Sequence, residues 1–353
     1  MEGGNFISLG LGLIIFSFCI SSVLVVPFIN LLYKLKFTRQ KEAPKKGKIP
    51  LFDKLHDYKA GTPVGGGILI ILIVSVLFLI IFYFSSFMGI YVRSAFELKA
   101  ELLIIFATFL SFGLLGLSDD LMKIFGKGRP GEKYLGLTFG LSKKQKFIAQ
   151  WILGFGIGFL IYRFLGIHML HIPLLNYTIQ LGIWYIPFAA FVIVSFSNAF
   201  NITDGLDGLA SGLLVICLLA FLIIAYGSLD TPLSIFISIW IGVMMAFLYF
   251  NVWPARLFLG DAGALSFGAM LGVIGLLTGS LVALIVIGGI FVLELLSSGI
   301  QMAGWQIFRK RIFPLARIHH TFLAIGWEEP KIVIRAWLAG IILAIFGLWL
   351  ATI

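Results

Sequence analysis

The sequence predicts an all-α integral membrane protein of about ten transmembrane helices. Of its 353 residues, 60% are hydrophobic and 12% are charged, about half the charged share of an average soluble domain. Stretches such as 6–32, 66–87 and 336–353 hold about 18 or more residues with almost no charge, which is enough to cross a hydrocarbon core as a helix. Because backbone groups in lipid must be satisfied internally, runs this long indicate helices rather than short barrel strands.

The apolar runs predict each span in turn. The first has no basic segment before it and no small-residue cleavage site after it, so we expect a span rather than a cleavable signal. The later runs are divided by polar, basic or glycine-rich segments. The predicted spans are residues 6–33, 66–88, 98–118, 146–166, 181–199, 209–227, 232–250, 263–279, 281–307 and 333–352.

The basic residues predict the orientation. Ten spans place segments 34–65, 119–146, 200–208, 251–262 and 308–332 on one face. That face holds all 26 Lys and Arg residues except Arg93, Lys99 and Arg163. Because such residues stay on the cytoplasmic side, this face is expected to be cytoplasmic, with both termini on the outer side. No internal repeat is visible, and residues 1–353 are expected to form a single polytopic membrane domain.

Five aspartates gather at the predicted cytoplasmic edge. Asp119 and Asp120 follow the third span, Asp204 and Asp207 follow the fifth, and Asp261 precedes the eighth. Any one of them could simply cap a helix. Five at one depth predict a functional site, because carboxylates at a membrane edge are costly unless they are solvated, paired or bound to a cation.

The surroundings of these acids indicate phosphoryl chemistry. Glycines beside them let a backbone approach a ligand closely. Hard oxygen ligands suit Mg²⁺, which neutralises charge during phosphoryl transfer. Lysines in segments 59–67 and 140–146 and the pair His319-His320 lie on the same predicted face. For the lysines, a purely topological role explains the pattern equally well.

Several ordered segments resemble the polyprenyl-phosphate N-acetylhexosamine-1-phosphate transferases. They are Gly-Thr-Pro-x-x-Gly-Gly at 61–67, the pair Asp119-Asp120, Asn-x-x-Asp-Gly-Leu-Asp-Gly at 201–208, Phe-Asn-x-x-Pro-Ala at 250–255 and Phe-Leu-Gly-Asp at 258–261. Gly-Leu-Ser-x-Lys-x-Lys at 140–146 and Gly-Trp-x-Glu-Pro at 326–330 favour the branch that uses UDP-MurNAc-pentapeptide over the branches that use UDP-GlcNAc.

The resemblance implies a reaction and its partners. Phospho-MurNAc-pentapeptide would pass from UDP-MurNAc-pentapeptide to undecaprenyl phosphate, a membrane lipid, giving lipid I and UMP for peptidoglycan synthesis. Mg²⁺ is the implied cofactor, and the bacterial inner (cytoplasmic) membrane is the implied location. We expect no nucleic acid partner, and small residues on helix faces would permit a homodimer.

The resemblance also implies residue roles, carried over by matching position. The metal ligand is Asp261. The implied catalytic residues are Asp119, Asp120, Asp204, His319 and His320, with Asp119 acting on the lipid phosphate. The implied substrate contacts, including uracil recognition at 205–207 and uracil stacking on Phe258, are Lys59, Thr62, Lys146, Asn201, Gly205, Leu206, Asp207, Asn251, Phe258 and Gln301.

One segment departs from the family. A Pro-x-His-His-His pattern is usual, whereas an ungapped match here places Arg317 at the proline and Thr321 at the third histidine. A one-residue gap would instead make Ile318 the substituted member. Threonine carries no charge near neutral pH, so the change could alter the sugar or peptide preference. A UDP-GlcNAc:polyprenyl-phosphate transferase is therefore the alternative function.

Two remoter alternatives are an intramembrane prenyltransferase and a transporter. Prenyltransferases also gather aspartates around Mg²⁺, but usually as Asp-x-x-x-Asp rather than Asp-x-x-Asp between glycines. A transporter would place its acids near the midplane, within repeated halves. The sequence leaves open whether the lipid phosphate attacks directly or an aspartate forms a phospho-enzyme first.

Overall fold

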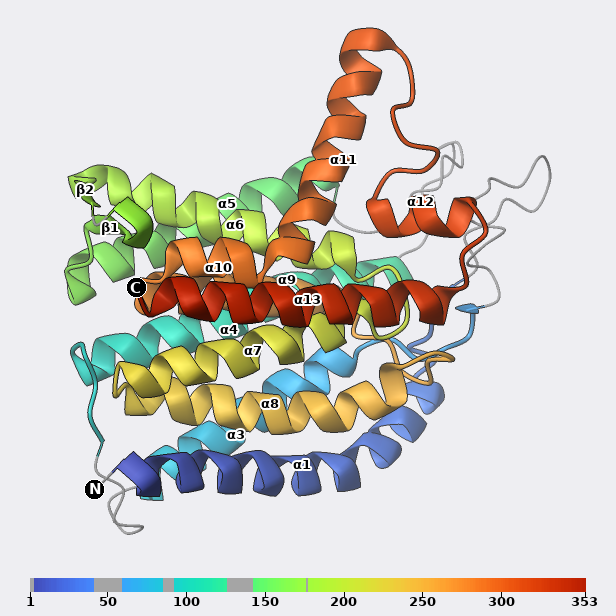
Figure 1. Ribbon diagram of the computed structural model, residues 1–353. Helices are drawn as coiled ribbons and strands as arrows, with labels where there is room; N and C mark the ends of the chain where they lie inside the picture. Colours follow the sequence, from blue (N-terminus) through green and yellow to red (C-terminus); the bar gives the residue numbers. More distant parts are fainter. Residues whose placement is uncertain (1–2, 41–58, 85–91, 126–141, 176) are drawn as a thin grey trace.

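The computed structural model describes residues 3–40, 59–84, 92–125, 142–175 and 177–353. Within them, ten helices are long and apolar enough to cross a membrane, which confirms the expected number of spans. They form a bundle with both termini at one end (Figure 1). The ten are α1 (Gly3–Lys34), α3 (Gly66–Phe84), α4 (Leu98–Phe125), α5 (Lys143–Leu160), α6 (Tyr185–Thr203), α7 (Leu209–Gly227), α8 (Thr231–Asn251), α9 (Gly260–Leu277), α11 (Gly289–Phe308) and α13 (Glu329–Ala351).

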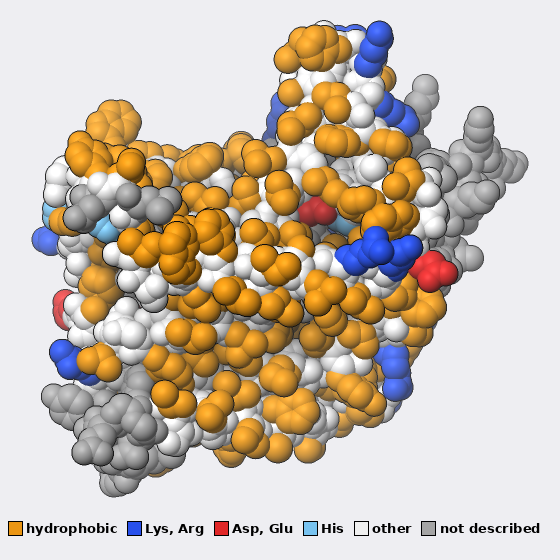
Figure 2. Space-filling model, viewed as in Figure 1, with side chains coloured by type: hydrophobic (Ala, Val, Ile, Leu, Met, Phe, Trp, Pro, Cys, Tyr) orange, Lys and Arg blue, Asp and Glu red, His pale blue; other side chains and the backbone are white. Residues whose placement is uncertain are grey.

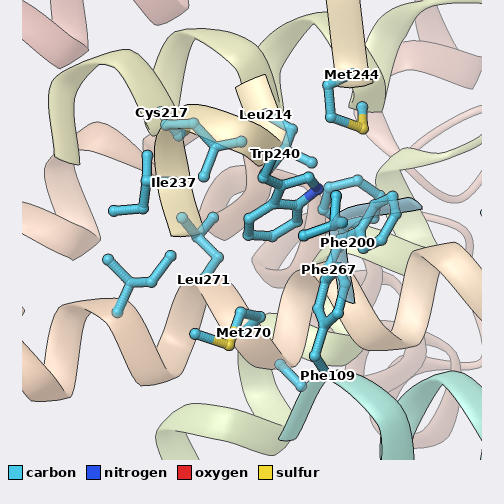
Figure 3. Packing of buried hydrophobic residues seen from close by; sticks show 14 of the residues in the cluster. Phe109, Phe200, Leu214, Cys217, Ile237, Trp240, Met244, Phe267, Met270 and Leu271 are labelled. Carbon is cyan, nitrogen blue, oxygen red and sulfur yellow. The ribbon is translucent and has the colours of Figure 1, made fainter. Parts of the chain in front are cut away.

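The centre of the bundle is α9, which packs between α4 and α6. In its apolar window 89% of residues are buried, against 28% in that of α1, so α9 is shielded while α1 faces outward. Aromatic rings fill the space around it: the Trp240 ring lies 5.2 Å from both Phe109 and Phe267 (Figure 3). Hydrophobic side chains cover the flank seen in Figure 2, as expected of a lipid-facing surface.

Three helices extend further than the sequence predicted. The observed α4 continues to Phe125, α6 continues to Thr203, and α9 begins at Gly260. Asp119, Asp120 and Asp261 therefore lie on helices and not in loops. The early start of α9 has a physical reason: the Asp120 carboxylate accepts hydrogen bonds from the backbone N–H groups of Asp261 and Ala262, both at 3.0 Å. Carboxylates stabilise a helix N-terminus in this way.

The predicted span 281–307 is wrong as a single helix. It divides into α10 (Leu281–Ile287) and α11 at Gly288, and α11 leaves the bundle at a steep angle (Figure 1). Two adjacent glycines have low helix propensity, and a Cβ on Gly288 would come within 2.8 Å of the Phe196 ring. Only 22% of the α11 window is buried.

Short elements complete the fold. The strands β1 (Met169–Ile172) and β2 (Tyr177–Gln180) form an antiparallel hairpin, a small exception to the all-α expectation. The short helix α12 (Ile318–Ala324) lies at the end of the bundle away from the termini (Figure 1). The predicted loops 34–65 and 119–146 fall partly outside the described residues, which omit 41–58 and 126–141.

Close packing of α4 on α9 gives a test of the fold. A Cβ on Gly116 would overlap the backbone carbonyl of Asp261, so Gly116→Ala should destabilise the protein by about 1–3 kcal/mol through overpacking. The measurement is the thermal unfolding midpoint in detergent. The matched control is Gly156→Ala in α5, where the new Cβ would meet nothing within 4 Å. Equal midpoints for the two variants would contradict this account of the α4–α9 contact.

Candidate active site

A cavity of about 200 Å³ lies where the ends of the helices away from the chain termini meet the loops. It brings together most of the predicted site residues from segments far apart in the sequence. Arg39 and Val64, which the sequence did not single out, also line it. The lining residues are Arg39, Lys59, Val64, Asp120, Asn201, Asp204, Gly205, Leu206, Asp207, Asn251, Phe258, Gly260 and Asp261.

Asp261 is held by an amide and two lysines. Its Oδ1 accepts a hydrogen bond from Asn201 Nδ2 at 3.1 Å, and its Oδ2 contacts Lys123 Nζ at 2.6 Å and also Lys146 Nζ. The same two lysines contact Asp119 Oδ2 at 3.0 and 2.9 Å. Two ammonium groups thus bridge two carboxylates. Lys123 was missed because α4 was expected to end at 118; on a helix, its i,i+4 spacing from Asp119 indicates the pair.

A second charge cluster surrounds Lys59. Its Nζ lies 2.6 Å from Asp207 Oδ1 and 2.5 Å from Glu329 Oε1, and all three side chains are buried. Asp207 also accepts a hydrogen bond from the Ala255 N–H and donates its own N–H to Glu329. Burial raises the pKa of Asp207, while Lys59 opposes that rise. Glu329, missed as a functional residue, lies in the Gly-Trp-x-Glu-Pro segment.

Phe258 and Asn251 are held by the neighbouring backbone. The Phe258 carbonyl accepts hydrogen bonds from the N–H groups of Gly65 and Gly66, and the Arg39 guanidinium lies 5.9 Å from the centre of its ring. Asn251 accepts a hydrogen bond from Ser211 Oγ at 2.6 Å and donates one to the Leu257 carbonyl at 2.9 Å. Both residues line the cavity from fixed positions.

Asp204 differs from the other acids. Its carboxylate makes no hydrogen bond or ion pair in the described part of the chain, and it is half-buried at the C-terminal end of α6. Burial, followed by the charges of Asp261 and Asp207, raises the pKa of Asp204 to about 7. This carboxyl group therefore changes charge near neutral pH.

The two histidines lie against the 204–208 turn. Glu294 of α11 accepts hydrogen bonds from the backbone N–H groups of Ile318 and His319, and its Oε2 lies 3.1 Å from His319 Nδ1. A Cβ on Gly205 would overlap the ring of His319, so only glycine permits this approach. Glu294 was missed, although an acid inside an apolar run is a recognisable signal.

Some predicted residues do not line the cavity: Asp119, Thr62, Lys146, Gln301, His319 and His320. Lys146 contacts both Asp119 and the cavity-lining Asp261, so these two residues lie directly behind the cavity wall. Gln301 accepts hydrogen bonds from the N–H groups of Ile312 and Phe313 at 3.1 and 2.9 Å, so it holds the connection between α11 and α12. The nucleotide contacts expected of Gln301 and Thr62 stay predictions.

The oxygen ligands present fit a magnesium ion that shares its coordination with substrate. Within the described residues no three or more His, Cys, Asp or Glu side chains come close enough to hold a metal by themselves. Asp261, Asp204 and Asn201 do line one cavity. Mg²⁺ commonly uses only one or two carboxylates and completes its shell with phosphate oxygens and water.

The Lys59 cluster predicts a loss of stability. Lys59→Gln leaves two buried carboxylates without their cation, and breaking a buried pair in this way costs about 3–5 kcal/mol. The thermal unfolding midpoint should fall well below that of Lys144→Gln, which removes an exposed lysine of α5. Similar midpoints would mean that the cluster does not support the fold.

Asp204 predicts a pH dependence. The folded state holds this proton up to about pH 7, whereas the unfolded chain releases it near 3.8. The folded protein therefore loses stability as pH rises between these values, and the loss is complete above about 7. Without added divalent cation, the midpoint of the wild type should fall between pH 5 and 8 relative to that of Asp204→Asn. Parallel curves for the two proteins would contradict the raised pKa.

Comparison with known proteins identifies the family of this chain. Residues 102–279 match the model of glycosyl transferase family 4. The phospho-N-acetylmuramoyl-pentapeptide-transferases of Bacillus subtilis and Geobacillus thermodenitrificans are 34% and 35% identical to this chain, covering 96% and 95% of each sequence. That of Clostridium perfringens (strain SM101 / Type A) is 38% identical and covers 91% of this chain and 90% of its own. The resemblance drawn from the sequence is confirmed: the chain belongs to glycosyl transferase family 4 and, within it, to the phospho-N-acetylmuramoyl-pentapeptide-transferases.

Proposed function

We propose that this protein transfers phospho-MurNAc-pentapeptide from UDP-MurNAc-pentapeptide to undecaprenyl phosphate and releases UMP. The observation that carries the proposal is the cavity itself, where acids and amides from α4, α6 and α9 lie together. Lys59 lines the same cavity, and Lys123 and Lys146 contact its Asp261. The names of the bacterial relatives support the muramyl substrate.

In the proposed reaction an oxygen of the lipid phosphate attacks the β-phosphorus of the nucleotide sugar. A new P–O bond forms, the P–O bond to UMP breaks, and UMP leaves with the electron pair. Asp261, with Asn201 and Asp204 beside it, would hold Mg²⁺, which supplies positive charge to the diphosphate. Lys123 and Lys146, already at Asp261, would add positive charge next to it. Asp119 would help to position the lipid phosphate.

We also propose the orientation of the protein. The site lies at the end of the bundle away from the termini (Figure 1), where the predicted basic loops emerge. By the positive-inside rule this end faces the cytoplasm of a bacterial cell, where the nucleotide sugar is soluble. The lipid acceptor would reach the site from within the membrane, because its long prenyl chain cannot leave the bilayer without a large loss of hydrophobic burial.

The alternative donor, UDP-GlcNAc, was considered because Thr321 replaces the third histidine of the family pattern. In the structure the Thr321 hydroxyl donates a hydrogen bond to the Leu315 carbonyl at 2.9 Å and turns back toward its own loop. Thr321 does not line the cavity. The departure from three histidines therefore gives little reason to change the donor sugar.

The test is UMP release by purified protein with Mg²⁺ and undecaprenyl phosphate. We expect release from UDP-MurNAc-pentapeptide and not from UDP-GlcNAc. Asp261→Ala should lower the rate by about a thousandfold or more, because several kcal/mol of charge stabilisation correspond to that factor.

The matched control is Glu97→Gln, which removes an exposed acid at the other end of the bundle and should leave the rate unchanged. Release from UDP-GlcNAc alone would keep the chemistry but refute the muramyl donor. Near-full turnover by Asp119→Asn at saturating Mg²⁺ would refute a role for that acid in direct attack and in a phospho-enzyme route alike.

A further inference from the structure

Arg317 has an unusual backbone conformation at the start of α12. Its φ of 75° and ψ of 133° lie in a region that favours glycine and that side-chain-bearing residues rarely adopt. Such strain persists only where the surroundings fix the chain, and it is frequent at ligand sites. In the ungapped match to the family pattern, Arg317 stands where proline is usual.

Contacts on both sides fix this residue. Glu294 accepts hydrogen bonds from the N–H groups of Ile318 and His319, directly after Arg317. The Thr321 hydroxyl donates to the Leu315 carbonyl, two residues before it. The His319 ring packs on Gly205 in the turn that carries Asp204. The start of α12 is therefore held against the cavity wall.

The Arg317 guanidinium makes no hydrogen bond and no ion pair within the described part of the chain, although it is half-buried. Asp204, Asp261 and Glu294 are close enough for their charges to act on it. The oxygens of Asp261 and Glu294 are already engaged by lysines, an amide, backbone N–H groups and His319. By contrast, Lys59, Lys123 and Lys146 each contact two carboxylates.

An arginine in this situation suits an anionic ligand. Its five N–H donors need acceptors when they are partly removed from water, and burial lowers the pKa of Arg317. The planar fork of a guanidinium matches two oxygens of one phosphate. The charges of Glu294, Asp204 and Asp261 favour the charged form of Arg317, although none of these acids forms an ion pair with it in the described part of the chain.

We propose that Arg317 binds a substrate phosphate, an interaction that a proline at this position could not make. The proposal rests on the proposed function, which supplies two phosphate sources: the lipid phosphate and the diphosphate of the nucleotide sugar. Arg317 would then be a binding residue at the edge of the cavity, two positions before His319, whose ring packs on the cavity-lining Gly205.

The experiment measures KM for undecaprenyl phosphate and for UDP-MurNAc-pentapeptide from initial rates of UMP release. Arg317→Gln should raise one of the two KM values by about tenfold or more, as expected for the loss of hydrogen bonds to a charged group. A rise for the lipid identifies the acceptor phosphate, and a rise for the nucleotide sugar identifies the diphosphate. Arg317→Lys keeps the charge but not the planar fork of the guanidinium, so its KM should lie between those of the wild type and Arg317→Gln.

Arg317→Gly separates binding from backbone strain. Glycine adopts a φ of 75° readily, so this variant keeps the loop conformation and loses only the side chain. We expect the same KM defect as for Arg317→Gln, with a thermal midpoint no lower than that of the wild type. Arg311→Gln, an exposed arginine of the same connection, should leave both KM values unchanged. Wild-type KM values for both substrates in Arg317→Gly would overturn the proposal.

Failure of the proposed function is distinguishable from failure of this site. A wild type that releases no UMP refutes the function, and the site is then tested without turnover. Inorganic pyrophosphate with Mg²⁺ should raise the thermal midpoint of the wild type more than that of Arg317→Gly, because a ligand of the folded state stabilises it. Equal stabilisation of the two proteins would overturn the phosphate site.

Discussion

The carboxylate of Asp120 joins α4 to the first turn of α9, and the rest of the site takes its position from that contact. The first N–H groups of a helix have no partner within it, and a buried carboxylate needs donors. The amides of Asp261 and Ala262 and the oxygens of Asp120 satisfy each other. Because Gly116 has no side chain, the two helices approach closely. Asp261 is thereby brought within reach of the lysines that hold Asp119.

Charge pairing then assembles the cavity from distant segments. Lys59 precedes α3, Asp207 lies between α6 and α7, and Glu329 begins α13. Even so, Lys59 Nζ lies 2.6 Å from Asp207 Oδ1 and 2.5 Å from Glu329 Oε1. Removal of one member leaves the others as buried charges without a partner, which is energetically costly. Such clusters therefore fix the arrangement of the helices more than they add net stability. Asp204 and Arg317, whose charged groups lack partners in the described chain, remain available to ligands.

The sequence predicted the ten spans and the convergence of acids because hydropathy and charge report directly on what can lie in lipid. It placed the ends of α4 and α6 too early and the start of α9 too late, since hydropathy falls at an aspartate whether or not the helix continues. A cap such as Asp120 on α9 depends on a residue 141 positions away. The break at Gly288 was missed because both of its flanks are equally apolar. Glu329 was missed because its partners are set by packing rather than by spacing, whereas Glu294 was missed although an acid inside an apolar run is itself a signal.

The balance of charge also bears on the cofactor. Six acids gather at the cavity and its edge: Asp119, Asp120, Asp204, Asp207, Asp261 and Glu329. Three lysines contact four of them, and Asp120 and Asp204 form no ion pair with a lysine in the described part of the chain. A nucleotide diphosphate and a lipid phosphate would bring further negative charge to a partly dehydrated space, where like charges repel more strongly than in water. A divalent cation on Asp261, as proposed, would offset that repulsion most directly, because it would add two positive charges where acids and phosphates meet. Burial is the main cause of the raised pKa of Asp204, and the charges of Asp261 and Asp207 raise it further. This second cause is the same repulsion between negative charges that the proposed magnesium ion would offset.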